Sequence, residues 1–172
     1  MSSHQKSPYG QWRSTISAAF VAEGVRSLSQ VRIVGNDAYW LESRPAENGR
    51  MALMCAGSDG IAYDSIAAPF NVRSRVHEYG GAAYLPIHRL EVTNHAQNIV
   101  RIIVFSHFTD NCLYLQEGKS STLKLTSDSQ HRFVDLVHDE KRSRIICVRE
   151  DHSISEAQAI NSICAIGLDG GD

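Results

Sequence analysis

Short runs of β-branched and aromatic residues, separated by turn residues, follow one another along most of this 172-residue chain. Such runs favour strands over helices, because branched side chains pack well on a pleated sheet and Gly, Asn, Asp and Ser suit tight turns. The chain is therefore predicted to be all-β. The expected strands are 31–34, 38–42, 51–55, 61–66, 82–85, 100–105, 112–115, 122–126, 133–137, 144–148 and 162–166.

The expected strands form sets that repeat along the chain. The sets begin at Val31, Ala82 and Phe133, which are 51 residues apart each time (82−31 and 133−82). Four short strands at this spacing are typical of a β-propeller blade, because one small sheet buries both faces only when neighbouring blades stack on it. On periodicity alone, an ordinary β-sandwich with coincidental spacing is the alternative.

The last set is shorter than the others. It has three expected strands, and Asp169-Gly170 then favours a hairpin turn into a fourth strand. We therefore expect a partial β-propeller over residues 31–172, made of about three four-stranded blades with the last one incomplete. Residues 1–30 form a lead-in segment. A short helix is expected over 16–23, with Ser14 and Thr15 before it and Gly24 after it.

The composition excludes several classes of function. A net charge of −2, from 17 basic and 19 acidic residues, gives no overall attraction to nucleic acid or to an anionic membrane. No apolar run approaches the roughly 20 residues that span a bilayer, and residues 1–6 lack the apolar core of a signal peptide. We therefore expect no nucleic-acid partner, no membrane partner and a cytoplasmic location.

The four cysteines are far apart, and each has apolar or strand-like neighbours: Cys55, Cys112, Cys147 and Cys164. Buried free thiols are therefore favoured over a disulfide pair or a zinc site, since no two have Cys-x-x-Cys spacing. None of the eight histidines lies in a His-Glu-x-x-His motif. The sequence indicates no metal site and no cofactor.

Five motifs are more specific: YGQW at 9–12, YWLESRP at 39–45, PFNVRSRVHEYGG at 69–81, FSHF at 105–108 and CVREDH at 147–152. Together they closely resemble the amino-terminal β-propeller of prolyl oligopeptidase-family serine peptidases. The acylaminoacyl peptidase and dipeptidyl aminopeptidase type is the most similar branch. The resemblance covers most of the chain.

The resemblance implies a piece of an enzyme. In that family an α/β-hydrolase domain carries the catalytic Ser, Asp and His, while the propeller covers the active site, admits short peptides and contributes to substrate binding. This chain has no Gly-x-Ser-x-Gly motif and no alternating βα pattern. We therefore expect no catalytic residue here and no peptide hydrolysis by the chain alone. The expected partners are an α/β-hydrolase domain and a short peptide substrate.

The segment 69–81 carries the candidate substrate-binding residues, Arg73, Arg75, His77 and Glu78. A peptide amino terminus suits a carboxylate such as Glu78, and a carboxylate or acyl carbonyl suits an arginine. The alternative is a structural polar cluster, in which Gly80 and Gly81 allow close backbone approach. The charged run 149–152 is interpreted as a loop network after a strand.

One stretch departs from the family pattern. Residues 86–99 intervene where the family has a short turn between two strands. They form an exposed loop, an extra hairpin or a foreign insertion, and Pro86 argues against simple continuation of the strand. The first hairpin of the second blade is therefore in doubt.

Two hypotheses of different class follow. The first is an amino-terminal propeller fragment that gates access and positions peptide substrate for a hydrolase domain. The second is a free-standing propeller-like interaction module without enzymatic activity. Because an independent module should close its set of sheets, the expected end in mid-blade favours the fragment. Open propeller edges also predict self-association.

Overall fold

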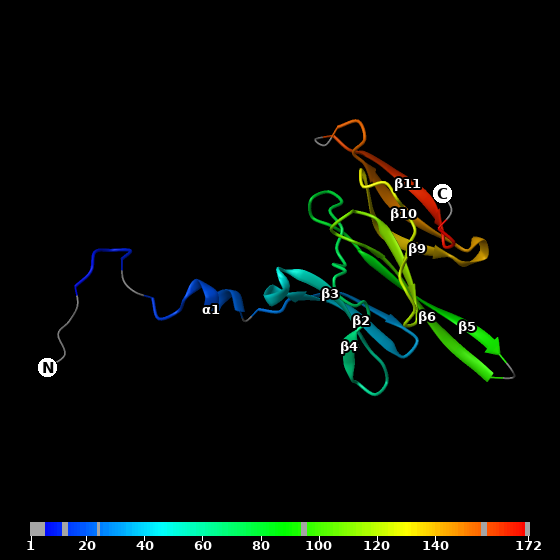
Figure 1. The fold of residues 1–172 in the computed structure, drawn as a ribbon, viewed down its shortest axis with the longest axis horizontal. Coiled ribbons are helices and arrows are strands. Elements are labelled where there is room, and N and C mark those ends of the chain that lie inside the picture. Colours follow the sequence, from blue (N-terminus) through cyan, green and yellow to red (C-terminus); the bar gives the residue numbers. More distant parts are fainter. Residues whose placement is uncertain (1–5, 12–13, 24, 94–95, 156–157, 171–172) are drawn as a thin grey trace.

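The computed structural model describes residues 6–11, 14–23, 25–93, 96–155 and 158–170, and it contains three antiparallel sheets in chain order (Figure 1). The first sheet contains β1 (Leu28–Val34), β2 (Asp37–Arg44), β3 (Arg50–Ala56) and β4 (Ala62–Asp64). The second contains β5 (Tyr84–Thr93), β6 (Ala96–Ser106), β7 (Leu113–Glu117) and β8 (Leu123–Lys124). The third contains β9 (His131–Asp139), β10 (Arg144–Asp151) and β11 (Ile160–Gly167).

The arrangement is a partial β-propeller, which confirms the predicted fold class. Within each sheet every strand pairs with the next strand of the chain, so each sheet is a meander. The described part of the third sheet has three strands, as expected for an incomplete blade. Two 3₁₀ turns, Pro45–Glu47 and Glu140–Arg142, join β2 to β3 and β9 to β10.

Apolar side chains fill the two spaces between the sheets. Between the first and second sheets the largest buried side chains are Tyr39, Tyr84 and Phe105. Between the second and third sheets, Val104 and Leu113 pack with Phe133 and Ile145. Since the second sheet contributes to both clusters, it buries both of its faces. This is the stacking that a blade requires.

A short piece of backbone, residues 81–83, bridges all three sheets. The side-chain amide of Gln30 in β1 donates to the carbonyl of Gly81 (2.7 Å), and its oxygen accepts from the amide of Ala83 (3.0 Å). From the other side, the amide of Asp135 in β9 donates to the carbonyl of Ala82 (3.0 Å), and the Asp135 carboxylate accepts from the Ala82 amide (3.0 Å). Gln30 and Asp135 both have positive φ angles, of 53° and 57°.

The sequence at 86–99 forms a regular extension of one hairpin. β5 pairs with β6 in unbroken register from Tyr84 opposite Phe105 to Thr93 opposite Ala96. The strand therefore continues through Pro86, and the interpretation of this residue as a strand breaker was wrong. β5 is an edge strand of its sheet, where a residue without an N–H is tolerated when that side faces away from the ladder.

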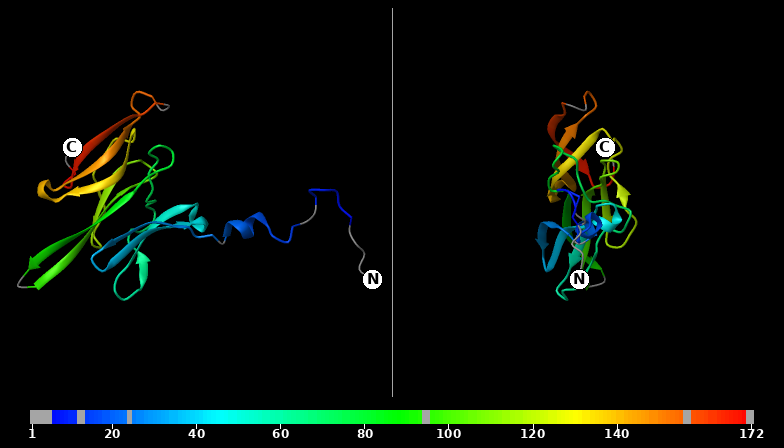
Figure 2. Two further views of the ribbon diagram at one scale, coloured as in Figure 1. Left: turned by 180° about the vertical axis from the view of Figure 1, so that it is seen from behind. Right: turned by 90° about the vertical axis from the view of Figure 1, so that its left-hand side faces the viewer.

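The part of the lead-in segment before β1 extends away from the sheets, as Figure 2 shows from two further sides. It contains one helix, α1 (Ala18–Glu23), which is shorter than the expected range of 16–23. Ser17, and not Ser14 or Thr15, caps its first turn, because the Ser17 hydroxyl accepts from the amide of Phe20 (3.0 Å). Gly24, expected to end the helix, lies outside the described residues.

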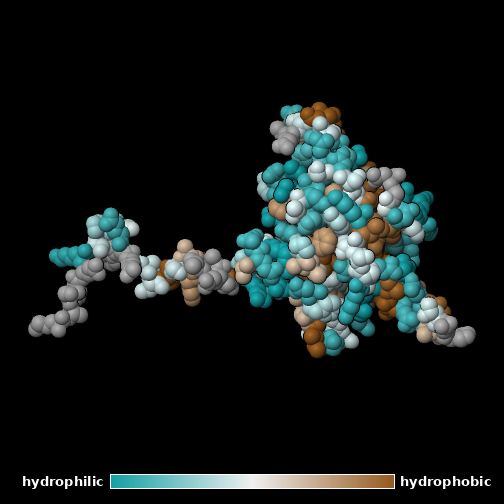
Figure 3. Space-filling model, in the orientation of Figure 1, coloured by the Kyte–Doolittle hydropathy of each residue, from teal (hydrophilic) through white to brown (hydrophobic). Residues whose placement is uncertain are grey.

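Several large apolar side chains remain exposed on the outer faces of the first and third sheets. Figure 3 shows such apolar surface interspersed with hydrophilic surface on one side of the molecule. On the third sheet, Val137 is 60% exposed and Ile163 is 79% exposed. Ile146 lies opposite Val137 and Val148 lies opposite Ile163, so these four residues share one face. We call this face the outer face of sheet three.

A substitution at Gly81 tests whether the bridging backbone, residues 81–83, lies as close to β9 as the structure shows. A Cβ atom at Gly81 would overlap Cγ2 of Val134, which is buried. We expect Gly81→Ala to lower the free energy of unfolding by about 2 kcal/mol, because the packed interior cannot make room. Urea unfolding measures the change.

The double variant Gly81→Ala, Val134→Ala is the matched control for this clash. Removing the two Val134 methyl groups makes space for the methyl group that Gly81→Ala introduces. The double variant should therefore lose less stability than the sum of the two single variants. Additive losses of stability in the double variant would contradict the proposed contact.

Candidate functional site

The candidate residues lie on a connection that joins the first sheet to the second, residues 65–83. We call it the crossing segment. It is held along its length by β-type contacts: Val72 forms an isolated antiparallel bridge with His107, and the amide of Arg73 donates to the carbonyl of Ser106 (3.1 Å). Phe70 packs edge to face against Phe105, with ring centroids 5.4 Å apart. These contacts hold the crossing segment against the end of β6 in the second sheet.

Arg73 and Arg75 gather at one aromatic ring. Their guanidinium carbons lie 4.7 Å and 4.1 Å from the centroid of Phe108. Such cation–π contacts orient an arginine and leave its N–H groups available. Among the described residues neither guanidinium forms an ion pair with a carboxylate. The pair therefore presents positive charge with free hydrogen-bond donors.

His77 and Glu78 occupy a tight turn with an uncommon backbone conformation. Both have positive φ angles, of 53° and 64°, a region that residues with a side chain rarely adopt. The turn is closed by the amide of Gly80, which donates to the carbonyl of Val76 (2.9 Å). Gly80 itself has φ of 75°, which glycine adopts without strain. The turn projects the Glu78 side chain outward, and this side chain is 84% exposed.

A buried carboxylate on the third sheet anchors this turn. Glu150, whose side chain is only 5% exposed, accepts from the backbone amide of His77 (3.1 Å) and lies 3.2 Å from its Nδ1. The second oxygen of Glu150 lies 2.8 Å from Nε2 of His152 and 3.5 Å from Nη1 of Arg132. All acceptor capacity of the buried carboxylate is therefore directed at cations and N–H donors.

Arg132 connects the anchor to the exposed part of the turn. Its Nη1 donates to the carbonyl of Arg75 (3.1 Å) and lies 3.4 Å from Oε1 of Glu78. One guanidinium therefore contacts the two carboxylates, Glu78 and Glu150, and the backbone between Arg73 and His77. The turn, Arg132, Glu150 and His152 together are called the anchor network below.

Electrostatics favour the ionised form of Glu150. Burial alone would raise its pKa, but the hydrogen bonds from His152 and from the backbone of His77, together with the nearby charge of Arg132, outweigh burial and hold the pKa below its usual range. The carboxylate is therefore charged at neutral pH. It can hold the turn without a ligand.

The interpretation of 149–152 as a loop after a strand was wrong. β10 extends to Asp151, so Arg149 and Glu150 lie within the strand. Alternation along the strand places Glu150 on the same face as Val148, and Glu150 is buried where the turn at His77 packs against this end of the strand. The sequence also gave no sign of Arg132, which precedes a predicted strand and is separated from Glu78 by 54 residues.

A second polar cluster, at the other end of the first two sheets, was not expected from the sequence. Asp37 is buried and accepts two hydrogen bonds from Arg101, one of them 3.1 Å long. His88 Nε2 lies 3.3 Å from the Asp37 carboxylate and 3.0 Å from the Tyr39 hydroxyl. The hydrogen bond from Arg101 lowers the pKa of Asp37, and burial lowers the pKa of His88. These groups join β2 to the extended hairpin.

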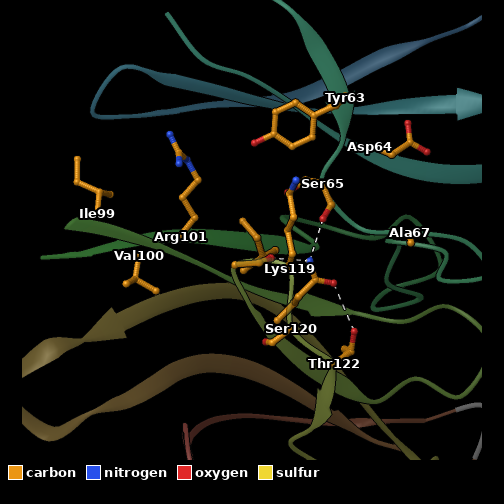
Figure 4. A pocket seen from close by; sticks show the side chains of 13 residues that line it. Tyr63, Asp64, Ser65, Ala67, Ile99, Val100, Arg101, Lys119, Ser120 and Thr122 are labelled. Atoms are coloured by element: carbon orange, nitrogen blue, oxygen red, sulfur yellow. Dashed lines mark hydrogen bonds between the residues drawn. The ribbon is translucent and has the colours of Figure 1, made fainter. Parts of the chain in front are cut away.

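Next to this cluster the first two sheets enclose a cavity of about 610 Å³ (Figure 4). The Tyr63 hydroxyl and the Arg101 guanidinium point into it from opposite walls in Figure 4. On the floor, the amide of Gln116 donates to the carbonyl of Ser65 (3.0 Å), and the Thr122 hydroxyl donates to Gln116 (3.4 Å). The cavity has a mostly apolar lining with a few polar groups, and none of them has the chemistry of a peptide hydrolase.

The fold and the motifs define a class, which is the propeller region of a prolyl oligopeptidase-family peptidase. The chain has the fold of this amino-terminal region, and the resemblance found in the sequence is confirmed by solved structures. No family model matches the chain, and no curated protein matches it either. No helix among the described residues is long and apolar enough to cross a membrane.

Three of the solved structures that the chain is similar to are of puromycin-hydrolysing proteins. A serine-to-alanine variant of puromycin hydrolase complexed with PGG matches with a TM-score of 0.80 and 32% identity, over 96% of this chain and 25% of the other. Puromycin hydrolase itself matches with a TM-score of 0.79 and 32% identity, over 98% and 26%. A Mycobacterium tuberculosis puromycin-hydrolyzing peptidase matches with 0.76 and 33%, over 97% and 26%. The chain spans about a quarter of these proteins.

Glu150→Gln tests the anchor network. The variant keeps the shape of the side chain but removes the buried negative charge, so we expect the free energy of unfolding at pH 7 to fall by about 2 kcal/mol. Because the folded-state pKa lies below the ordinary value of 4.5, this stabilisation is present above that pH and is lost as the pH falls through the folded-state value.

Urea unfolding at several pH values checks both parts of this prediction. The difference between Glu150→Gln and the unmodified chain should shrink at strongly acid pH. Glu140→Gln, at an exposed carboxylate in the second 3₁₀ turn, is the control and should change little at any pH. Equal stabilities of Glu150→Gln and the unmodified chain at pH 7 would show that the network does not stabilise the fold.

Proposed function

We propose that this chain is the amino-terminal propeller region of a cytoplasmic serine peptidase, and that it gates access and positions a short peptide for an α/β-hydrolase domain. The dipeptidyl aminopeptidase or acylaminoacyl peptidase type remains our closer assignment. The observation that carries the proposal is the anchored turn, whose exposed carboxylate, Glu78, shares one short segment with two arginines that form no ion pair with any described carboxylate. The likeness to puromycin-hydrolysing enzymes supports the peptidase assignment.

The anchor network supports a role for Glu78 in binding. Its carboxylate has one partner among the described residues, Arg132 at 3.4 Å, and is otherwise open to solvent. Arg132 is already engaged by Glu150 and by the backbone of Arg75. A substrate ammonium group can therefore bind Glu78 without dismantling the network. Rigid placement of the carboxylate reduces the entropy that binding costs.

The two arginines complement this carboxylate. A peptide that places its amino group at Glu78 extends a carbonyl or carboxylate toward Arg73 or Arg75, whose N–H groups are free to donate. A carboxylate and two arginines on one segment suit a short zwitterionic or amino-terminal peptide. We propose that this end of the sheets faces the hydrolase domain.

Glu78→Gln, made in the chain joined to its hydrolase domain, tests the site. We expect kcat/KM for substrates with a free amino group to fall about tenfold or more, because they lose a charge-assisted hydrogen bond worth roughly 1.5 to 3 kcal/mol. Amino-acetylated counterparts should be little affected. The measurement is the ratio of kcat/KM for a matched free and acetylated pair.

A control variant and one outcome separate a binding role of Glu78 from a structural one. Glu140→Gln, at an exposed carboxylate on the opposite end of the third sheet, is the control and should leave the ratio unchanged. An unchanged ratio in Glu78→Gln, together with lower thermal stability, would leave Glu78 with a structural role only.

The outer face of sheet three gives a separate prediction. We propose that a further blade covers this face in the whole peptidase, so the isolated chain should self-associate through it. Substituting Ile163→Lys places a charge at its most exposed apolar position and should shift the chain toward monomer. Sedimentation over a range of concentrations measures this.

Leu90→Lys is the matched control for surface charge. Leu90 is an exposed apolar residue on the extended hairpin, away from sheet three. If Leu90→Lys and Ile163→Lys reduce association equally, the outer face is not the contact. A compact monomer of the unmodified chain at high concentration would favour the free-standing module instead.

A further inference from the structure

Two of the four cysteines lie against each other on neighbouring strands. Cys147 in β10 is directly opposite Cys164 in β11, and their sulfur atoms are 3.5 Å apart. Directly opposite residues of an antiparallel pair have Cα atoms about 4.5 to 5.5 Å apart, which lies within the range that a disulfide spans. Rotation of the two side chains is therefore enough to bring the sulfurs into bonding distance.

A cavity gives solvent access to one of these thiols. Cys164 lines a space of about 360 Å³ between the second and third sheets, and its side chain is only partly buried. Cys147 lies behind it and is buried in the apolar cluster. A small molecule therefore reaches Cys164 first. The walls come from the segment 126–128 and from β9 to β11, all of which this chain supplies.

An arginine with an unused donor borders the same cavity. Arg149 is two residues from Cys147 along β10, so both side chains lie on the face that carries Cys164. The Nε–H of Arg149 is buried and has no hydrogen-bond partner among the described residues. The Cys147 thiol as hydrogen-bond donor and the charge of Arg149 both lower the pKa of Cys164, while burial opposes them. This direction agrees with the position of Cys164 at the cavity.

We propose that Cys147 and Cys164 form an oxidisable thiol pair, which a small hydroperoxide such as hydrogen peroxide converts into a disulfide between β10 and β11. The thiolate, and not the thiol, is the nucleophile in such reactions. The position of Cys164 in the cavity makes it the attacking residue. Cys147 is the resolving residue.

The reaction balances in two steps. The Cys164 thiolate attacks one oxygen of hydrogen peroxide, the O–O bond breaks, and the products are a sulfenic acid and hydroxide, which takes a proton to become water. The Cys147 sulfur then attacks the Cys164 sulfur, the S–O bond breaks, and the leaving hydroxide takes the Cys147 proton to form a second water. The two sulfurs lose two electrons, and the peroxide is reduced to two waters.

The other two cysteines provide an internal comparison. Cys55 lies in β3 and Cys112 lies just before β7; both are buried, and neither has a second thiol as a partner among the described residues. Burial raises the pKa of the Cys112 thiol. Both should remain thiols under conditions that oxidise the pair.

Peptide mapping of the native chain tests the proposal. The chain is treated with hydrogen peroxide at pH 7, its remaining thiols are alkylated, and a non-reducing digest is analysed by mass spectrometry. We expect one disulfide that joins Cys147 to Cys164, with the loss of two hydrogens, and alkylation of Cys55 and Cys112. Alkylation of all four cysteines, or oxidation of Cys55 and Cys112 as fast as the pair, would overturn it.

Variants test the order of the steps. In Cys147→Ser the sulfenic acid at Cys164 cannot be resolved and should be trapped by dimedone, whereas in Cys164→Ser no adduct should form on Cys147. Arg149→Gln should slow disulfide formation at pH 7 about fivefold, because a Cys164 pKa that rises from about 7 by about one unit lowers the thiolate fraction by about that factor. Arg144→Gln, on the same strand near its other end, should not change the rate. Dimedone labelling of Cys147 instead of Cys164 would contradict the assigned roles.

Discussion

The arrangement of the three sheets depends on hydrogen bonds to one short piece of backbone, residues 81–83. The side chain of Gln30 binds it from the first sheet and Asp135 binds it from the third. Because these bonds join the Gln30 and Asp135 side chains to peptide groups, the lengths of the two side chains fix how far the first and third sheets lie from the bridging backbone. Gly81 permits the approach, since any larger residue would meet Val134. The apolar clusters supply the main free energy, and this bridge fixes the geometry in which they pack.

Two buried carboxylates connect the sheets at opposite ends. Asp37 binds Arg101 and His88 of the extended hairpin, and Glu150 binds the crossing segment through His77. A buried charge without partners would be strongly unfavourable, so each carboxylate requires its neighbour to be present and correctly placed. The two contacts therefore contribute specificity to the assembly.

The sequence predicted the strands and their grouping well, because alternation, branched side chains and turn residues are local signals. It failed where the outcome depends on partners distant in sequence. Pro86 was interpreted as a breaker, since its position at a sheet edge is a property of the whole blade. Glu150 was interpreted as a loop residue, since its partner His77 is 73 positions away. The pairing of Asp37 with Arg101, 64 positions apart, gave no local signal at all. The sequence singled out the segment 69–81, whose binding role stays a prediction, but it did not link this segment to its anchor, Glu150.

The distance of 73 positions between His77 and Glu150 also has a consequence for biosynthesis. A ribosome completes the turn that carries Glu78 well before it adds the residue that anchors this turn. Until β10 emerges and pairs with β9, the backbone at His77 lacks the acceptor that offsets its unfavourable conformation. The nascent first and second blades can therefore exist before the turn at His77 and Glu78 is fixed. The binding role proposed for Glu78 would require the third blade, so a ribosome-bound chain of two blades would lack it.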